Sequence, residues 1–284
     1  MEAAKYRSTG CLATFFRHPL TLGMSWMNTR FSCTGCGKCC TDHHVPLTLE
    51  EARRWAQGGG QIMVLLEAFL ENGPGLHNLG LSHAQQEHAR RRSLPVLCGA
   101  ASAFISITFA AYNSGRCRNL MDDNRCAIYE QRPLVCQIYP MEINPHIPLR
   151  PQAKECPEEA WANGPDLIHG GRLVDAQLAG LIERSRQADR DEIVAKAAVC
   201  ARLGIRTAAL KGDGFTTWLP RTDGFLAALG QVHEQGPVQA HQAAQAWTLH
   251  VPNPDLASQL EETGAMIEAI LASDCAFIAL RSAA

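Results

Sequence analysis

Hydrophobic and polar residues alternate most clearly in the stretch FISITF, within residues 103–110. Ile105, Ile107 and Phe109 fall on one side of an extended chain there, and that side is strongly apolar. A period of two is typical of a β-strand with one buried face. The strand lies in residues 94–115, which carry no charge and are long enough to span a bilayer. Proline, glycine and polar side chains dilute that apolarity, so we expect a buried strand and no membrane helix.

A different pattern, VPLTLEEARRWAQGGG, predicts the first helix. Thr48 is a good N-cap, Glu51 completes a capping box three positions later, and Gly58–Gly60 ends the helix. We expect a second short helix over residues 61–70, which ends at the turn Asn72-Gly73-Pro74. Residues 71–93 are polar and are expected to be rich in loops.

The rest of the chain is first rich in proline and then has apolar residues at helical spacing. The frequent prolines Pro133, Pro140, Pro145, Pro148 and Pro151 predict that residues 133–157 form a rigid, extended segment and not a helix. Beyond Trp161 the apolar residues recur at helical spacing and alanine is frequent. We expect a short strand at 247–251 and amphipathic helices over residues 172–187, 189–203, 222–235 and 255–272.

Composition and charge exclude several classes of protein. The chain is 46% hydrophobic and 19% charged, which is typical of a globular protein. A net charge of -2 with a pI of about 6.6 gives no attraction to nucleic acid or to an anionic membrane. The start MEAAKYRSTGCLATFFRHPL lacks the apolar core and cleavage site of a secretory signal. We therefore expect a cytoplasmic protein with no nucleic-acid or membrane partner.

Twelve cysteines change this ordinary picture. In a reducing compartment, clustered thiols bind metal more often than they form disulfides. Cys11, Cys98, Cys200 and Cys275 are expected to be core or incidental thiols. The remaining cysteines lie in or near polar, turn-rich stretches between residues 31 and 160, and they are the candidate metal and cofactor ligands. These ligands are Cys33, Cys36, Cys39, Cys40, Cys117, Cys126, Cys136 and Cys156.

The densest of these stretches is CTGCGKCC, at residues 33–40, where the first three cysteines recur at every third position. Gly35 and Gly37 permit positive φ, so the loop can curl its thiols toward one centre and leave backbone N–H groups facing sulfur. Zinc sites usually draw on two C-x2-C pairs, whereas three cysteines at this spacing with a distant fourth favour a [4Fe–4S] cluster. Zinc remains the alternative.

Cys40 directly follows Cys39, and side chains of neighbouring residues generally diverge. In two-cluster ferredoxins an extra cysteine after such a loop serves the other cluster. Two interpretations therefore stay open: two metal centres, or one polynuclear centre that the loop bridges.

The later cysteines have basic and aromatic neighbours. Cys117 and Cys126 each directly follow an arginine, and Arg132 lies shortly before the next cysteine. Guanidinium groups lower thiol pKa values and offset the charge of several thiolates. We expect Tyr129 and Tyr139 to roof the site and to limit the access of water.

The ordered series CTGCGKCC, VPLTLEE, CAIYEQRPLVCQIYP and KECP resembles the bacterial CxxCxxCC cysteine-cluster family, described as zinc- or iron-chelating. The resemblance covers about residues 31–160. Distant relatives include the flagellin lysine methylases, which join a similar region to S-adenosylmethionine-dependent methyl transfer. Cys117 and Cys156 occupy places where such proteins often have further cysteines. The resemblance implies metal binding by Cys33, Cys36, Cys39, Cys40, Cys126 and Cys136.

These observations predict an α+β, mostly helical fold in three parts. Residues 1–30 form a variable, loosely packed N-terminal extension, which is least structured in residues 1–26. Residues 31–160 form an irregular, metal-stapled cysteine-cluster domain with short strands, and residues 161–284 form a mainly α-helical region.

The expected function is metal binding through eight thiolates, with a structural or redox role and an unidentified protein or redox partner. Two alternatives stay open: a methylase-like enzyme that uses S-adenosylmethionine, and a zinc-stapled interaction module. No catalytic motif or nucleotide-binding loop is recognisable, so the sequence leaves enzymatic activity undecided.

Overall fold

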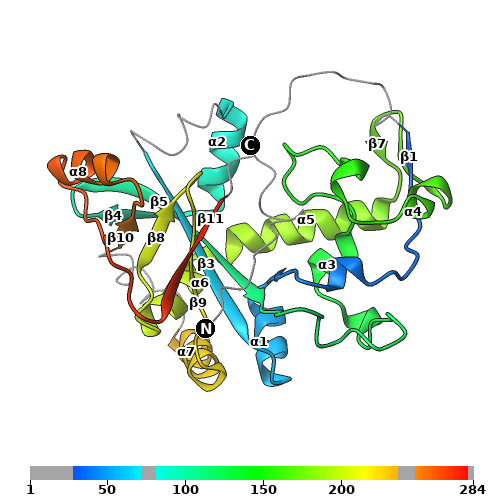
Figure 1. Ribbon diagram of the computed structural model, residues 1–284, viewed down its shortest axis with the longest axis horizontal. Coiled ribbons are helices and arrows are strands. Elements are labelled where there is room, and N and C mark those ends of the chain that lie inside the picture. The colour runs from blue at the N-terminus through cyan, green and yellow to red at the C-terminus, as the bar shows by residue number, and fades with distance from the viewer. Residues whose placement is uncertain (1–27, 72–80, 236–246, 281–284) are drawn as a thin grey trace. The chain divides into compact units, whose positions relative to one another are not determined.

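The fold was taken from a computed structural model, which describes residues 28–71, 81–235 and 247–280 (Figure 1). The predictions for residues 1–26, for the turn at 72–74 and for Cys11 lie outside these residues. The fold is α+β, as predicted, with 36% helix and 26% strand. The prediction of a mostly helical protein is wrong, because residues 161–284 hold the strands β6 to β11 as well as helices.

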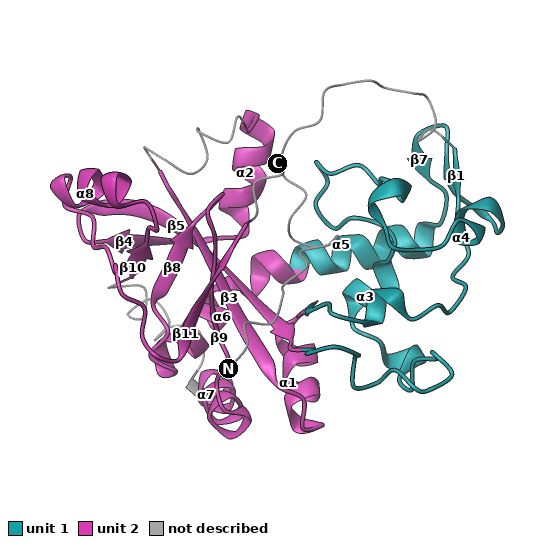
Figure 2. Cartoon of the chain, viewed as in Figure 1, with its two compact units in different colours: residues 1–45, 113–187, 283–284 teal, residues 46–112, 188–282 magenta. Residues whose placement is uncertain are grey.

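The chain forms two compact units, each built from separate parts of the sequence (Figure 2). We call residues 1–45, 113–187 and 283–284 the cysteine unit, because it holds all eight candidate ligands. We call residues 46–112 and 188–282 the sheet unit. The chain passes between the units near β2, near Tyr112 and within α5.

The sheet unit is organised around β3 (Ile62–Leu70). This strand pairs antiparallel with β5 and β9 and parallel with β8, so it has partners along both edges. The longest path of the sheet runs β10-β8-β3-β5-β2, with β4 on β5 and β11 on β9. The other strands are β2 (Val45–Leu47), β4 (Leu94–Cys98), β5 (Ala101–Ala111), β8 (Thr207–Leu210), β9 (Gly214–Trp218), β10 (Thr248–His250) and β11 (Cys275–Ala279).

The helix predicted over residues 61–70 is wrong, because this stretch is β3. Its sequence IMVLLEAFL is almost continuously apolar, and every residue except Glu67 is buried. A strand covered on both faces shows no alternation, so it reads like a short buried helix. The strand predicted at 103–110 is confirmed as β5, with Ile105, Ile107 and Phe109 buried.

The capping box predicted for the first helix is present in α1 (Leu49–Gln57). The Glu51 amide donates to Thr48 Oγ1 at 3.3 Å, and the Thr48 amide donates to Glu51 Oε2 at 2.9 Å. Helices α1 and α6 pack on β5. The ring centres of Phe109 in β5 and Phe225 in α7 are 5.3 Å apart. The remaining helices of this unit are α2 (His83–Arg91), α6 (Ile193–Arg202), α7 (Thr222–Gln235) and α8 (Pro254–Glu262).

Several other predicted bounds differ from the structure. Residues 71–93 contain α2, which the polar composition concealed. Helix α8 ends ten residues earlier than predicted. Gly264 adopts a φ of 84°, so the chain turns back after the helix, and the Met266 amide donates to Cys98 O. Residues 172–187 and 189–203 correspond to α5 (Ala176–Asp191) and α6. No helix among the described ranges combines the length and the apolarity that crossing a bilayer requires.

The cysteine unit has short elements and a small apolar cluster. Leu149, Leu167 and Ile168 are its buried members, with Phe31 and Trp161 among the residues packed against them. The segment predicted to be wholly extended contains the helical turn α3 (Leu134–Ile138), which follows Pro133 directly. The other elements are β1 (Thr29–Arg30), η2 (Lys38–Cys40), η4 (Tyr129–Gln131), η5 (Pro151–Ala153), α4 (Glu159–Ala162), β6 (Asp166–His169) and β7 (Arg172–Leu173).

Two of the expected bystander thiols lie in the core of the sheet unit. Cys98 and Cys200 are both 0% exposed, and burial raises the pKa of Cys98 to about 12 and also raises the pKa of Cys200. An unfolded thiol ionises near pH ~8.5. The stability that these thiols contribute is therefore fully present below that pH and is lost as the pH rises toward the folded pKa.

We predict that Cys98→Ala will lose less stability than the parent as the pH rises, because the variant has no buried thiol to ionise on unfolding at this position. The slope of the free energy of unfolding against pH should become shallower by about 1.4 kcal/mol per pH unit above about pH 9. Urea unfolding of the reduced protein, followed by tryptophan fluorescence, measures this slope. Val64→Ala is the control, since Val64 is 0% exposed and carries no proton, so stability should fall equally at every pH. A slope unchanged in Cys98→Ala would contradict the assignment.

Candidate metal centre

The loop of residues 33–40 curls at its two glycines, as predicted. Gly35 and Gly37 have φ values of 68° and 73°, and the turn η2 begins directly after Gly37. The Gly35 amide donates to Cys33 Sγ at 3.4 Å. A Cβ on Gly37 would lie 3.0 Å from Asn124 Oδ1, whereas a Cβ on Gly35 would meet nothing within 4 Å. The loop therefore aims a backbone N–H at one sulfur and leaves little room beside Gly37.

The two adjacent cysteines face each other. Their Sγ atoms are 3.9 Å apart, so the expected divergence of these side chains is wrong. The pKa of Cys40 is lowered to about 7, mainly by the hydrogen bond from Cys39; burial opposes this, and the charges of Arg132 and His43 add to it. The same bond raises the pKa of Cys39, and burial and repulsion by Cys40, Cys136 and Cys33 add to this. Cys40 is thus the thiol most ready to ionise near neutral pH.

Main-chain pairing places Cys40 beside Cys117. The Cys117 amide donates to Cys40 O at 2.7 Å, and the next residues, Thr41 and Arg116, form an antiparallel bridge. Burial raises the pKa of Cys117, and repulsion by neighbouring thiolates adds to it. Two cysteines that are far apart in sequence are therefore held together by the backbone itself.

A tight hairpin brings Cys126 to the same place. The Leu120 amide donates to Cys117 O at 2.9 Å, and Leu120 then forms an antiparallel bridge with Cys126. Cys136 reaches this group from α3. Burial is the main cause that raises the pKa of Cys136, and repulsion by Cys40, Cys117 and Cys126 raises it further, while Arg132 lowers it.

Cys156 is held by a separate set of contacts. Its Sγ lies 3.1 Å from the Tyr139 hydroxyl, and the hydroxyl donates when Cys156 is a thiolate. Lys154 Nζ lies 5.4 Å from the centre of the Tyr139 ring and forms an ion pair of 2.5 Å with Glu142. Burial raises the pKa of Cys156, the Tyr139 bond lowers it, and repulsion by the loop thiols Cys36 and Cys33 raises it.

The two predicted roof residues behave differently. Tyr139 contacts a candidate ligand directly, whereas Tyr129 is 54% exposed and stacks against Arg132, whose guanidinium carbon lies 3.7 Å from the ring centre. Two supporting residues were not predicted from the sequence: Lys154, whose side chain is only 4% exposed, and Asn124, which lies against Gly37. The signal for Lys154 was its place in KECP, two residues before a candidate ligand.

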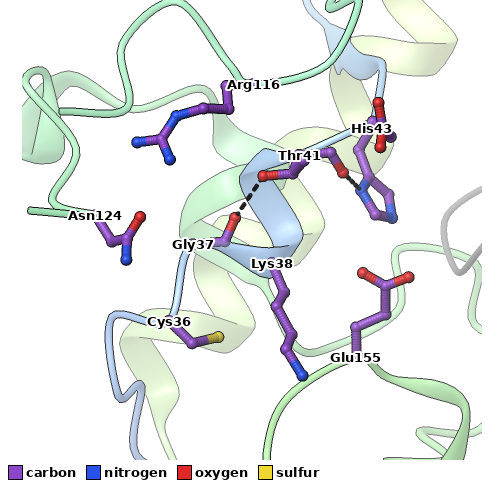
Figure 3. Close-up of a pocket in the computed structure, with 9 residues that line it drawn as sticks. Cys36, Gly37, Lys38, Thr41, His43, Arg116, Asn124 and Glu155 are labelled. Carbon is purple, nitrogen blue, oxygen red and sulfur yellow. Dashed lines mark hydrogen bonds between the residues drawn. The ribbon is translucent and has the colours of Figure 1, made fainter. Parts of the chain in front are cut away.

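A cavity of about 350 Å³ adjoins the loop, and the Cys36 sulfur contributes to its wall (Figure 3). Arg116 and Asn124 lie on one side, and His43 and Glu155 lie on the other. The His43 ring donates from Nδ1 to Thr41 O at 2.6 Å, which fixes its orientation. The cavity gives small polar solutes access to the loop thiols.

The residues present fit a thiophilic metal, because the donors are unoxidised thiols. No cysteine within the described residues forms a disulfide. Cys33 is exposed and the other seven candidate ligands are half-buried. In the part of the chain that the structure describes, no three Cys, His, Asp or Glu side chains are already arranged as a finished metal site. The thiols are therefore gathered as neighbours, and metal binding requires their side chains to turn toward a common ion.

Comparison with known families agrees with this donor set. Residues 32–159 match the family model CxxCxxCC, described as a "putative zinc- or iron-chelating domain". The match confirms the resemblance seen in the sequence and indicates that this segment chelates zinc or iron. No curated protein and no solved structure matches the chain. The relation to flagellin lysine methylases stays a prediction.

We predict that Gly37→Ala weakens metal binding more than Gly35→Ala does. Both glycines have left-handed φ values, but only a Cβ at Gly37 crowds Asn124. We expect a further loss of about 1 kcal/mol, or roughly fivefold in affinity, for Gly37→Ala. Competition for zinc with a coloured chelator, under reducing conditions, gives both affinities. Equal affinities for the two variants would show that the contact with Asn124 does not shape the loop.

Proposed function

We propose that this protein binds zinc or iron through the eight thiols of its cysteine unit, and that the metal holds this unit together. The observation that supports the proposal most strongly is the gathering of eight unoxidised thiols inside the segment that matches the family model, several of them close enough to repel one another when ionised. Thiolate repulsion is unfavourable unless a cation lies between the sulfurs, and bound zinc or iron supplies that charge.

The small apolar cluster of the cysteine unit supports a stapling role. Burial of Leu149, Leu167 and Ile168 contributes about 2 kcal/mol for each side chain. A structural metal contributes about 10 kcal/mol or more to folding. Since short elements and loops make up most of this unit, metal binding is the larger of the two contributions.

We favour an iron–sulfur cluster for the C-x2-C-x2-C loop. Its spacing and its curl at Gly35 and Gly37 suit a cluster, and the N–H that faces Cys33 is the kind of donor that tunes such a centre. An iron–sulfur cluster would supply electron transfer, and the cavity beside Cys36 would be the route by which small reactants approach. The partner would then be a redox protein, in a reducing compartment such as the cytoplasm.

A zinc-stapled interaction module is the alternative, because four thiolates also suit a tetrahedral zinc ion. An enzyme of the methylase type has no support of this kind, and calorimetry with S-adenosylmethionine tests it separately.

We predict that protein purified without air contains iron with acid-labile sulfide, and that it is brown with an absorbance band that dithionite bleaches. Colourless protein with stoichiometric zinc would support the interaction module and reject the cluster. Protein that takes up neither metal would contradict the proposed function.

The division into ligands and bystanders predicts different effects for two serine variants. Cys36→Ser should lower metal content by at least half, whereas Cys275→Ser should leave it unchanged, because Cys275 lies on β11 in the sheet unit. Elemental analysis of both purified variants gives the comparison. Equal metal contents in the two variants would overturn the division.

A further inference from the structure

We propose that the eight thiols divide into two adjacent four-thiolate centres, and this inference rests on the proposed metal-binding function. We call the first the loop centre, formed by Cys33, Cys36, Cys39 and Cys156. We call the second the hairpin centre, formed by Cys40, Cys117, Cys126 and Cys136.

Backbone hydrogen bonds support the hairpin centre. The bond from the Cys117 amide to Cys40 O and the bridge between Leu120 and Cys126 join three of its cysteines through short main-chain paths. Cys136, on α3, lies close enough to Cys40, Cys117 and Cys126 for their charges to act on it, so it is the fourth member. The four cysteines come from η2, the hairpin and α3.

The loop centre is supported by contacts between residues 31–39 and the segment that follows residue 154. The Ser32 amide donates to Ala160 O at 2.8 Å, which holds the start of the loop beside that segment. Cys36 and Glu155 line the same cavity, so the residue before Cys156 lies next to the loop (Figure 3). The repulsion that Cys156 receives comes from Cys36 and Cys33, in agreement with this contact.

Cys39 and Cys40 mark the boundary between the two centres. Cys39 continues the three-residue spacing of the loop and lies near both Cys33 and Cys136, while Cys40 is tied to Cys117 by the backbone. Their sulfurs are 3.9 Å apart, so the two centres lie side by side. The adjacent cysteines therefore give each centre one ligand from the same turn.

The surroundings of the two centres differ in access. The cavity opens onto Cys36 of the loop centre, and Cys33 is exposed, whereas the four hairpin thiols are half-buried. The loop centre should consequently release its metal to a chelator before the hairpin centre does.

Zinc reconstitution of the reduced, metal-free full chain tests the division. The parent should bind two zinc ions per chain, while Cys156→Ser and Cys126→Ser should each keep one. The double variant Cys156→Ser with Cys36→Ser should bind as much zinc per chain as either single variant, since both changes remove the loop centre. Combining Cys156→Ser with Cys126→Ser should abolish binding, and Cys275→Ser should keep two ions as the matched control.

A measurement on the parent avoids any variant that fails to fold. The zinc-loaded protein is treated briefly with a chelator, its exposed thiols are alkylated, and the modified cysteines are identified by mass spectrometry. Cys33, Cys36, Cys39 and Cys156 should react together and first, at least severalfold faster than the thiols of the hairpin centre. Alkylation that mixes the two sets, or complete loss of zinc from each single variant, would overturn the division while leaving metal binding intact. A parent that binds no zinc and contains no iron would instead refute the proposed function.

Discussion

Mutual repulsion between thiolates is the constraint on which the cysteine unit depends. The chain collects eight thiols there, and the pKa values of Cys39, Cys117, Cys136 and Cys156 are raised partly because each thiol faces others. Arg132 and His43 oppose this effect at Cys40, where their charges lower the pKa. A bound cation displaces the thiol protons and offsets the repulsion between the thiolates. Metal binding and the ordering of the surrounding loops are therefore coupled.

The sheet unit does not share this dependence. Its strand β3 has partners along both edges, and side chains such as Val64, Leu66 and Phe109 are fully buried. Burial of apolar surface therefore holds this unit together, while coordination is proposed to hold the cysteine unit. The thiols Cys98 and Cys200 fit the same contrast, because they are fully buried and pack as small side chains in the core of this unit.

Local signals in the sequence were reliable where one short segment decides the structure. The capping box at Thr48, the alternation of Ile105 and Phe109 and the positive φ of Gly35 all follow from residues within a few positions. The buried strand β3 was read as a helix because covering both faces removes its alternation. The approach of Cys39 to Cys40 depends on the side-chain conformations within the turn η2, and the contact of Cys156 with Tyr139 depends on how separate segments pack. The spacing of the cysteines carries no information about either. The candidate ligands could be named from the sequence, but their grouping required the fold.

X-ray absorption spectroscopy of the metal in anaerobically purified protein tests the central claim most directly, because it reports the atoms bonded to the ion. Coordination by thiolates predicts a first shell of sulfur alone, with about four sulfur atoms per metal at a distance of about 2.3 Å. An iron–sulfur cluster would add a metal–metal distance to the same sulfur shell. A first shell dominated by nitrogen or oxygen would contradict the account, because the metal would then be bound by something other than the eight cysteines.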